Sequence, residues 1–435
     1  MADFAASAHP AVQAQLDRLA YLSSAGDRLG LGRIAQLLDR LGRPQDALPP
    51  VFHVAGTNGK GSTCAFLRAA LEASGHVVHM FTSPHLVRFN ERIRIAGRLI
   101  EDEPLAALLS EVLDASGGVD PSFFEVTTAV AFLAFARTPA DACILEVGLG
   151  GRLDATNVIQ RPLVTGITSL AIDHQQFLGK RMADIAAEKA GIAKRGAPLI
   201  TQLYPPAISG RIGEIANGIG AHWLPRGGEW DAIASRKLRY RDRNGTLELP
   251  LPRLPGRHQA MNAALAVAIM RHQDKLEVPG SALDAAMGLA DWPARMQQLG
   301  PGPLTRLLAP GSELWIDGGH NPSAARAIAA FARRRSPSGL PLTLVFASLA
   351  SKDPKGTLKP FEGIAEAVHT VPIGDHEFRQ PEELAALART MGFRANAHAT
   401  LHQALKAIKA PARVLVFGSL YLAGEALAAN GQAPD

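Results

Sequence analysis

The chain has few of the features that mark secreted, membrane-spanning or nucleic-acid-binding proteins. Its 435 residues include only two cysteines, Cys64 and Cys143. Two are too few for a disulfide framework or a zinc site, and they fit a reducing cytosol. The N-terminus has no basic start followed by an apolar core, so we expect no signal peptide. The longest apolar run, residues 129–136, is too short to cross a bilayer. These absences predict a cytoplasmic protein without a membrane partner.

The sequence also lacks a long basic run. Lys and Arg number 45 against 40 Asp and Glu, which gives a formal charge of only +5. Such a balance disfavours a nucleic-acid partner and fits an enzyme that handles anionic substrates. The composition, with 47% hydrophobic and 20% charged residues, is ordinary for a globular protein. A chain of this length exceeds one typical core, so we expect two domains or more.

The most informative segment is a glycine-rich turn at residues 52–63, FHVAGTNGKGST. An apolar strand leads into it and a helix follows, so its backbone N–H groups would face a polyphosphate. Lys60 would add a positive charge, and Ser62 could offer a hydroxyl to Mg²⁺. The spacing departs from the standard Walker A motif, because Val54 stands at the first glycine position and Gly61 separates the lysine from the serine. A plain glycine turn is the alternative interpretation.

Alternating strands and helices predict an α/β fold for the first part of the chain. Residues 9–42 read as helical, with a turn at 29–32. Further along the chain we expect strands at 51–54, 77–81, 142–147 and 164–168, and helices at 62–74 and 124–137. This alternation indicates a mainly parallel, P-loop ATPase-like sheet with helices on both faces. Around Asn244-Gly245 the residues alternate between apolar and polar, which predicts a hairpin added antiparallel to that sheet.

Proline and glycine accumulate between residues 293 and 312, where we place a domain boundary. Residues 1–295 would form the ATP-binding domain, and residues 296–435 a smaller, Rossmann-like α/β domain. The elements expected in the second domain are strands at 314–316, 342–346 and 414–417 and helices at 324–333 and 382–391.

Glu146 ends an apolar strand and is followed by glycines. In a P-loop protein a second acidic strand end holds Mg²⁺ directly or through water, so Glu146 is a metal candidate. A carboxylate that only caps a turn is the alternative.

The loop at 151–157, GRLDATN, comes next, and α/β proteins bind ligands at such strand ends. Arg152 could bind a carboxylate or phosphate there and Asp154 a polar ring or hydroxyl, unless the two merely pair in a solvated loop.

His174 and Lys189 are weaker candidates. His174 follows another expected strand, which suits either a second metal site or a structural histidine. Lys189 lies in a helix of small apolar residues, so its amine either points into the site or pairs at the surface with Glu188.

A further strand-to-helix junction occurs in the second domain, with the sequence DGGHN at 317–321. Asp317, at the strand end, suits a ribose hydroxyl or an ammonium group. His320 could approach a phosphate.

Six motifs occur together in a characteristic order. They are VAGTNGKGST, SPHLVRFNERI, ILEVGLGGRLDATN, DH at 173–174, EKAGI at 188–192 and DGGHN. With them, the chain resembles the folylpolyglutamate synthase/dihydrofolate synthase family of the Mur-ligase superfamily over roughly residues 25–420. It departs from the family pattern at Gly319, where alanine is frequent, and at Gln175, where threonine is frequent. Neither position is a proposed ligand.

The resemblance implies an ATP-dependent amide ligase that works through an acyl phosphate captured by the amine of L-glutamate. The nucleotide would be bound by Gly56, Thr57, Asn58, Gly59, Lys60, Gly61, Ser62, Asn262, Arg295 and Asp317. Two Mg²⁺ ions would be held by Ser62, Ser83, Glu146, His174 and Lys189, the last as a carbamate. Lys60, Lys189 and His320 would act in catalysis. The pteroate site would involve Asp27, Arg28, Ser122, Phe123, Phe124, Glu125, Arg152, Leu153, Asp154 and Ala155.

The acceptor is the open question at this stage. The resemblance favours a bifunctional enzyme that acts on 7,8-dihydropteroate and on tetrahydrofolates. A monofunctional polyglutamylase, a Mur-type ligase and a nucleotide-dependent switch without ligase activity are the alternatives. We expect a monomer.

Overall fold

The computed structural model describes residues 5–22, 29–334, 339–374 and 376–434. The chain forms two compact units. The first comprises Met1–Arg253 and His258–Asp291, and the second comprises Leu254–Arg257 and Trp292–Asp435. The short segment Leu254–Arg257, which ends at the first residue of α9 (Arg257–Arg271), is therefore assigned to the second unit. The sequence-based boundary was placed after residue 295, whereas the structural units change over at Trp292.

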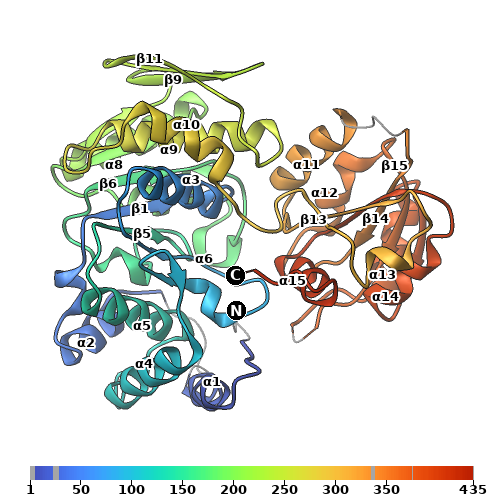
Figure 1. The fold of residues 1–435 in the computed structure, drawn as a ribbon, viewed down its shortest axis with the longest axis horizontal. Coiled ribbons are helices and arrows are strands. Elements are labelled where there is room, and N and C mark those ends of the chain that lie inside the picture. Colours follow the sequence, from blue (N-terminus) through green and yellow to red (C-terminus); the bar gives the residue numbers. More distant parts are fainter. Residues whose placement is uncertain (1–4, 23–28, 335–338, 375, 435) are drawn as a thin grey trace. The chain divides into compact units, whose positions relative to one another are not determined.

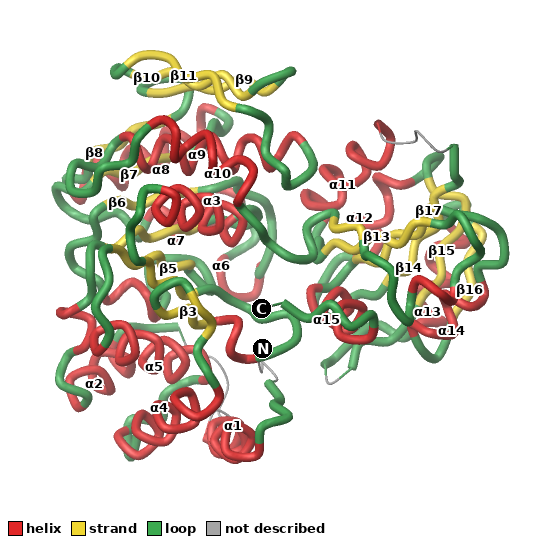
Figure 2. The backbone as a smooth tube through the Cα atoms, viewed as in Figure 1, coloured by secondary structure: helices red, strands yellow, loops and turns green. Residues whose placement is uncertain are grey.

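An eight-stranded sheet forms the centre of the first unit (Figures 1 and 2). Its order is β4-β3-β2-β5-β1-β6-β7-β8, and only β3 and β4 run antiparallel to their neighbours. The strands are β1 (Val51–Ala55), β2 (Val78–Phe81), β3 (Ile93–Ile95), β4 (Arg98–Leu99), β5 (Ala142–Glu146), β6 (Val164–Ile167), β7 (Pro198–Thr201) and β8 (His222–Pro225). Val54 in β1 pairs with Glu146 in β5 and with Gly166 in β6. The carboxyl ends of these three strands consequently meet at one edge.

Helices cover the large sheet. They are α1 (Pro10–Leu22), α2 (Gly32–Arg40), α3 (Lys60–Ala73), α4 (Asp102–Ala115), α5 (Phe123–Arg137), α6 (Gln175–Leu178), α7 (Met182–Ala190), α8 (Pro206–Ile219), α9 (Arg257–Arg271) and α10 (Gly280–Leu289). Helix α5 is apolar on nearly every side, which is typical of a helix buried all round. It packs with α1, α2 and α4 in one core, and α7 and α8 pack in a second core beside β6 and β7. No helix among the described residues is both long enough and apolar enough to span a membrane.

The predicted hairpin is present, but the expectation that it joins the parallel sheet is wrong. Strands β9 (Trp230–Ala234), β10 (Leu238–Asp242) and β11 (Gly245–Leu249) form a separate three-stranded sheet, which lies beyond α9 and α10 (Figures 1 and 2). Its buried face explains this position. Arg271 of α9 donates two hydrogen bonds to Asp242 at 2.7 and 2.8 Å, and Tyr240 stacks on Trp230. The hairpin is therefore attached to a helix rather than to the edge of the large sheet.

The second unit has a six-stranded sheet of order β12-β13-β17-β14-β15-β16, parallel except for β12. Its strands are β12 (Gln297–Gln298), β13 (Glu313–Asp317), β14 (Leu342–Phe346), β15 (Ala365–Thr370), β16 (Arg394–Ala397) and β17 (Arg413–Phe417). Its helices are α11 (Pro322–Arg334), α12 (Pro354–Leu358), α13 (Pro381–Thr390), α14 (Leu401–Ala407) and α15 (Leu420–Ala429). The Rossmann-like α/β arrangement expected from the sequence is confirmed.

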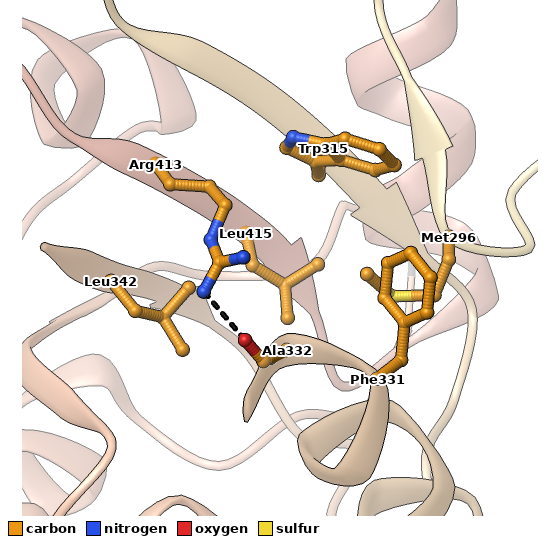
Figure 3. Close-up of a pocket in the computed structure, with 7 residues that line it drawn as sticks. All are labelled: Met296, Trp315, Phe331, Ala332, Leu342, Arg413 and Leu415. Atoms are coloured by element: carbon orange, nitrogen blue, oxygen red, sulfur yellow. Dashed lines mark hydrogen bonds between the residues drawn. The ribbon is translucent and has the colours of Figure 1, made fainter. Parts of the chain in front are cut away.

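A small pocket between α11 and this sheet shows how the helix is held (Figure 3). Arg413, at the start of β17, is buried and donates a hydrogen bond from its guanidinium to the carbonyl of Ala332 at 2.8 Å. A cation near a helix C-terminus interacts favourably with the helix dipole. The remaining lining is apolar and consists of Met296, Trp315, Phe331, Leu342 and Leu415. We therefore assign the pocket to the packing of α11.

Candidate active site

The glycine-rich turn runs from the end of β1 into the first turn of α3, as the sequence predicts. Gly56 and Gly59 both have positive φ, +149° and +91°. A Cβ at Gly56 would lie 1.7 Å from Thr168 Oγ1, and a Cβ at Gly59 would lie 2.4 Å from Asn262 Oδ1. Only glycine fits such backbone and such space. Asn262, predicted as a nucleotide contact, thus lies directly against the turn.

The loop after β6 holds this turn in place. The amides of Thr57 and Asn58 both donate to the carbonyl of Ser169, at 2.9 and 3.3 Å. In return, the hydroxyls of Thr168 and Ser169 donate to the carbonyl of Asn58, at 2.9 and 2.8 Å. The sequence motif did not reveal these contacts, because Thr168 and Ser169 lie more than a hundred residues from the turn.

Lys60, Ser62 and Glu146 gather at the start of α3. The Lys60 ammonium lies 3.8 Å from a carboxylate oxygen of Glu146, and both side chains are largely buried. Ser62 Oγ is buried and has no hydrogen-bond partner within the described part of the chain. A buried hydroxyl without a partner is costly, and a metal ion or phosphate would satisfy it. These residues therefore fit a nucleotide with a divalent ion.

Lys189 points from α7 to the same turn, and its ammonium donates to the carbonyl of Gly56 at 2.9 Å. Burial lowers its pKa to about 7, and the nearby positive charge of Lys60 acts in the same direction. The carboxylates of Asp173, Asp154 and Glu188 oppose this shift. A substantial fraction of Lys189 is therefore a neutral amine near pH 7. The sequence left open whether this lysine was a surface residue, and the structure buries it.

The loop after β6 also carries Asp173 and His174. His174 has a left-handed backbone conformation, with φ of +50°, and its amide donates to Asp173 Oδ1 at 2.9 Å. Asp173 is buried and raises the pKa of Lys189 through its negative charge. The sequence-based prediction named only His174, although Asp173 directly precedes it.

Ser83 follows the end of β2, which is the strand beside β5. Together with Ser62, Glu146, His174 and Lys189 it completes the predicted metal set. No group of three or more His, Cys, Asp or Glu side chains in the described ranges is placed to hold a metal ion. A metal at this edge would therefore depend on hydroxyl groups, phosphate oxygens and a modified lysine as well as Glu146.

The loop after β5 is fixed from two sides. Asp154 is buried and accepts hydrogen bonds from the amides of Leu149 and Thr156 and from the Thr156 hydroxyl, at 2.8, 3.0 and 2.5 Å. Burial raises the pKa of Asp154, and these donors oppose the shift. On the other side, the Arg152 guanidinium donates twice to one Glu188 oxygen, at 2.8 and 3.0 Å. The structure therefore pairs Arg152 with Glu188 and not with Asp154.

Side chains at the start of α5 hold the backbone of that helix end through hydrogen bonds. Ser122 and Glu125 form a capping box, because the Ser122 hydroxyl accepts from the Glu125 amide and Glu125 Oε2 accepts from the Ser122 amide. The same Glu125 oxygen accepts from Arg33 at 3.0 Å. Phe124 packs on Gly148, where a Cβ would lie 2.5 Å from the ring. An aromatic ring of this segment thus lies against the loop after β5.

The remaining predicted acceptor residues are Phe123, Leu153 and Ala155, and Asp27 with Arg28. Phe123 and Ala155 are buried, and Leu153 is half-buried. Asp27 and Arg28 lie outside the described residues.

In the second unit, Asp317 ends β13 and is buried. Its two oxygens accept hydrogen bonds from the amides of Met296 and Gly319, at 2.8 and 2.7 Å. Burial raises its pKa, and the Arg295 charge opposes this. Arg295 stands between Ala294 and Met296, which both have positive φ, +55° and +45°. Non-glycine residues in this conformation are strained and cluster at functional sites.

His320 is half-buried near the start of α11, and its Nδ1 lies 3.0 Å from the carbonyl of Gly318. A Cβ at Gly318 would lie 2.9 Å from the Arg295 guanidinium. The three predicted residues of this unit, Arg295, Asp317 and His320, therefore occupy one strand end.

Known proteins resemble this chain in both sequence and architecture. The family model for the Mur ligase, glutamate ligase domain, matches residues 305–420. A relative from Bacillus subtilis, dihydrofolate synthase/folylpolyglutamate synthase, is 36% identical over 363 residues, which cover 79% of this chain and 81% of the relative. The structure of Escherichia coli FolC in complex with DHPP and ADP has a TM-score of 0.85 and 32% identity and covers 98% of both chains.

A second solved structure bears on the metal. The bifunctional folylpolyglutamate synthase/dihydrofolate synthase of Yersinia pestis, complexed with AMPPNP and a Mn ion, has a TM-score of 0.85 and 30% identity. The match covers 98% of this chain and 99% of that one.

Proposed function

The chain belongs to the dihydrofolate synthase/folylpolyglutamate synthase family, and we propose that it is an ATP-dependent ligase that joins L-glutamate to 7,8-dihydropteroate and to tetrahydrofolates. The observation that carries this proposal is the glycine turn at β1 with Lys60, Ser62, Glu146 and Lys189 around it. This arrangement suits a reaction in which phosphate charge has to be held and neutralised.

The chemistry needs no nucleophile from the protein. An oxygen of the acceptor carboxylate attacks the γ-phosphorus of ATP, and ADP leaves. The glutamate amine then attacks the acyl carbon, phosphate leaves, and the amine loses a proton. Both steps are accelerated by positioning and by stabilisation of negative charge. Lys60 would supply that charge at the phosphates, and the amides of the turn would orient them. His320, at the strand end of β13, would also act in catalysis.

A divalent ion would be held by Ser62, Ser83, Glu146 and His174. It would screen the negative charge of the phosphate oxygens. Lys189 extends this set if its neutral amine adds to CO₂, which forms an N–C bond and releases a proton. The product is a carbamate, which places a negative charge where the neutral amine carried none. A pKa of about 7 supports this step because the neutral amine is the reactive form. With the carbamate formed, Lys189 would hold the second of two divalent ions.

The acceptor would lie at the loop after β5. Phe124 packs on Gly148 at the start of this loop, and Asp154 accepts from the Leu149 amide within it. We propose that these residues contact the acceptor together with Arg152, Leu153 and Ala155. The buried ring of Phe123 and the capping box of Ser122 and Glu125 fix the start of α5 there.

We further propose that the enzyme is a cytoplasmic monomer. Its two cysteines are buried and free, as expected in a reducing compartment.

The test is ADP release in the presence of ATP, Mg²⁺ and L-glutamate, with 7,8-dihydropteroate or tetrahydrofolate as acceptor. Turnover with both acceptors supports the bifunctional enzyme. Turnover with tetrahydrofolate alone would make the chain a polyglutamylase. ADP release that does not depend on glutamate, or none with either acceptor, would contradict the proposal.

A further inference from the structure

A buried chain of three side chains connects the centre of β1 to the loop after β5. His53, in the middle of β1, is completely buried, and its Nε2 lies 2.8 Å from the hydroxyl of Thr156. That hydroxyl donates to Asp154 Oδ1 at 2.5 Å. Asp154 completes its shell with the amides of Leu149 and Thr156. None of the chemistry described above uses His53.

The hydrogen bonds in this chain have only one consistent direction. Both oxygens of Asp154 accept from backbone amides, which favours the ionised carboxylate. An ionised carboxylate only accepts, so Asp154 takes the single hydroxyl proton of Thr156. The Thr156 oxygen then has lone pairs to offer and must accept from His53. His53 is therefore the tautomer with its proton on Nε2. Burial lowers the pKa of His53 to about 3, with a smaller contribution from Lys194, so the ring stays neutral.

The position of His53 is unusual for a residue that only fills space. Parallel strands covered on both faces are normally continuous apolar runs, and Phe52 and Val54 fit that rule. His53 Nδ1 is buried and has no hydrogen-bond partner among the described residues. Burying an imidazole costs desolvation that a valine would avoid. The contact that offsets this cost is the one to Thr156.

We propose that His53 is a positioning residue for the acceptor substrate. It fixes the Thr156 hydroxyl and through it the carboxylate of Asp154, so that the loop after β5 is held against the strand that carries the phosphate turn. Asn157 ties the same loop to the end of α7, because its amide donates to the carbonyl of Gly191 at 3.1 Å. The loop is thereby set between β1 and α7. The inference rests on the proposed function, because it requires this loop to contact the pteroate.

The first test compares H53L with H53Q in steady-state kinetics of the full chain. Leucine removes the donor, whereas the glutamine amide can donate from a similar position. We expect H53L to raise KM for dihydropteroate about fivefold, the factor for one neutral buried hydrogen bond. KM for ATP should stay within about twofold, and H53Q should recover most of the loss. An unchanged KM for dihydropteroate in H53L would overturn the inference. So would an equal loss in kcat and in both KM values of H53L that H53Q does not restore.

A second variant covers the case in which H53L fails to fold. T156V removes the middle hydroxyl at constant shape, and T156S retains it as the matched control. We expect T156V to raise the acceptor KM and T156S to leave it nearly unchanged. Where H53L folds, H53L/T156V should raise the acceptor KM no further than either single variant, because each substitution breaks the same chain. Additive effects would contradict a shared chain.

Nitrogen-15 NMR of the histidine rings provides a readout that needs no substrate. The His53 signals are identified by their loss in H53Q. We expect a protonated Nε2 and a bare Nδ1, unchanged down to about pH 5 because the ring does not titrate there. The opposite tautomer would overturn the inference even if the wild-type enzyme uses dihydropteroate. Conversely, absent turnover by the wild type with the expected tautomer would contradict the proposed function and leave the chain of hydrogen bonds established.

Discussion

Two strand ends, one in each unit, look alike in sequence but use their carboxylates differently. Glu146 ends β5 and Asp317 ends β13; each is followed by glycine-containing sequence, and each is buried. Asp317 accepts from two backbone amides within 2.8 Å. Glu146 faces the Lys60 ammonium at 3.8 Å. Asp317 therefore holds the backbone of its own loop, whereas Glu146 faces the charged end of another side chain.

This difference separates structural from chemical roles. A carboxylate that accepts backbone amides contributes to stability, because its removal leaves buried donors without partners. For Glu146, which lies beside Lys60 at the glycine-rich turn, we expect a role in catalysis instead, through a divalent ion that neutralises the charge of the phosphates. The predictions below test this distinction, beginning with the largest expected effect.

Replacing Lys60 should have the largest effect. In K60A the charge at the phosphate turn is lost, and we expect kcat to fall by about 10²–10³-fold or more. The fold should remain, since Lys60 lies at the first turn of α3, where alanine is a good helix former. Kinetics and circular dichroism of purified protein check both parts. Normal activity in K60A would contradict the assignment of the turn.

Removing Lys189 should be nearly as severe. We expect K189A to lose about 10²-fold in kcat, because a group at the metal site is missing. Short carboxylic acids should restore part of the activity by taking the place of the carbamate. Full activity of K189A without any addition would exclude the carbamate role.

The pH dependence of this modification follows from the same residue. The pKa of Lys189 in the folded protein is lowered to about 7, so the reactive neutral amine increases as pH rises. About one tenth of the amine is neutral at pH 6 and about nine tenths at pH 8. With ¹³C-labelled CO₂, a carbamate signal absent from K189A should therefore grow over this interval. A signal that declines between pH 6 and 8 would contradict this.

The two carboxylates can be compared directly with amide substitutions. E146Q should lower kcat by about 10²-fold and leave the melting temperature almost unchanged. D317N places an amide against a backbone donor, and we expect a loss of about 1–3 kcal/mol in the free energy of unfolding. Thermal melts and kinetics of both variants test the contrast. Equal stability losses in the two would remove the distinction drawn here.

The last comparison concerns glycine, and its smallest expected effect is that of the control variant. G56A combines a positive φ with a clash against Thr168, so it should destabilise the protein by about 1–3 kcal/mol and weaken ATP binding. G210A is the matched control, because Gly210 lies in α8 with open space at its Cβ. It should be neutral or stabilise by about 0.5–1 kcal/mol. Thermal melts with and without ATP separate the two effects. Equal melting temperatures in the two variants would show that the turn tolerates a side chain.

Much of the fold was predictable because local patterns specify it. The strand before the turn, the helix after it and the strand ending at Glu146 are all marked by apolar runs beside glycine. The second unit follows the same alternation. The hairpin at Asn244 was correctly predicted, but its partner was not, because the contact between Asp242 and Arg271 joins residues far apart in sequence.

Site residues were harder to interpret because the sequence does not give the partner of a polar side chain. The sequence favours Arg152 as a ligand for anions, with a pair between Arg152 and Asp154 as the alternative, and only the structure shows its contact with Glu188. His53 read as one more strand residue, since its partner Thr156 lies about a hundred residues away. Asp173 could have been found from the sequence, because it directly precedes His174 in the same loop.

The separate sheet of β9, β10 and β11 has a practical consequence. It carries none of the residues assigned to nucleotide, metal or acceptor, and its turn at Asn244 and Gly245 is exposed with open space around it. Insertions are best tolerated at exposed turns of this kind. A fluorophore or affinity tag placed there would report on this enzyme without touching its chemistry.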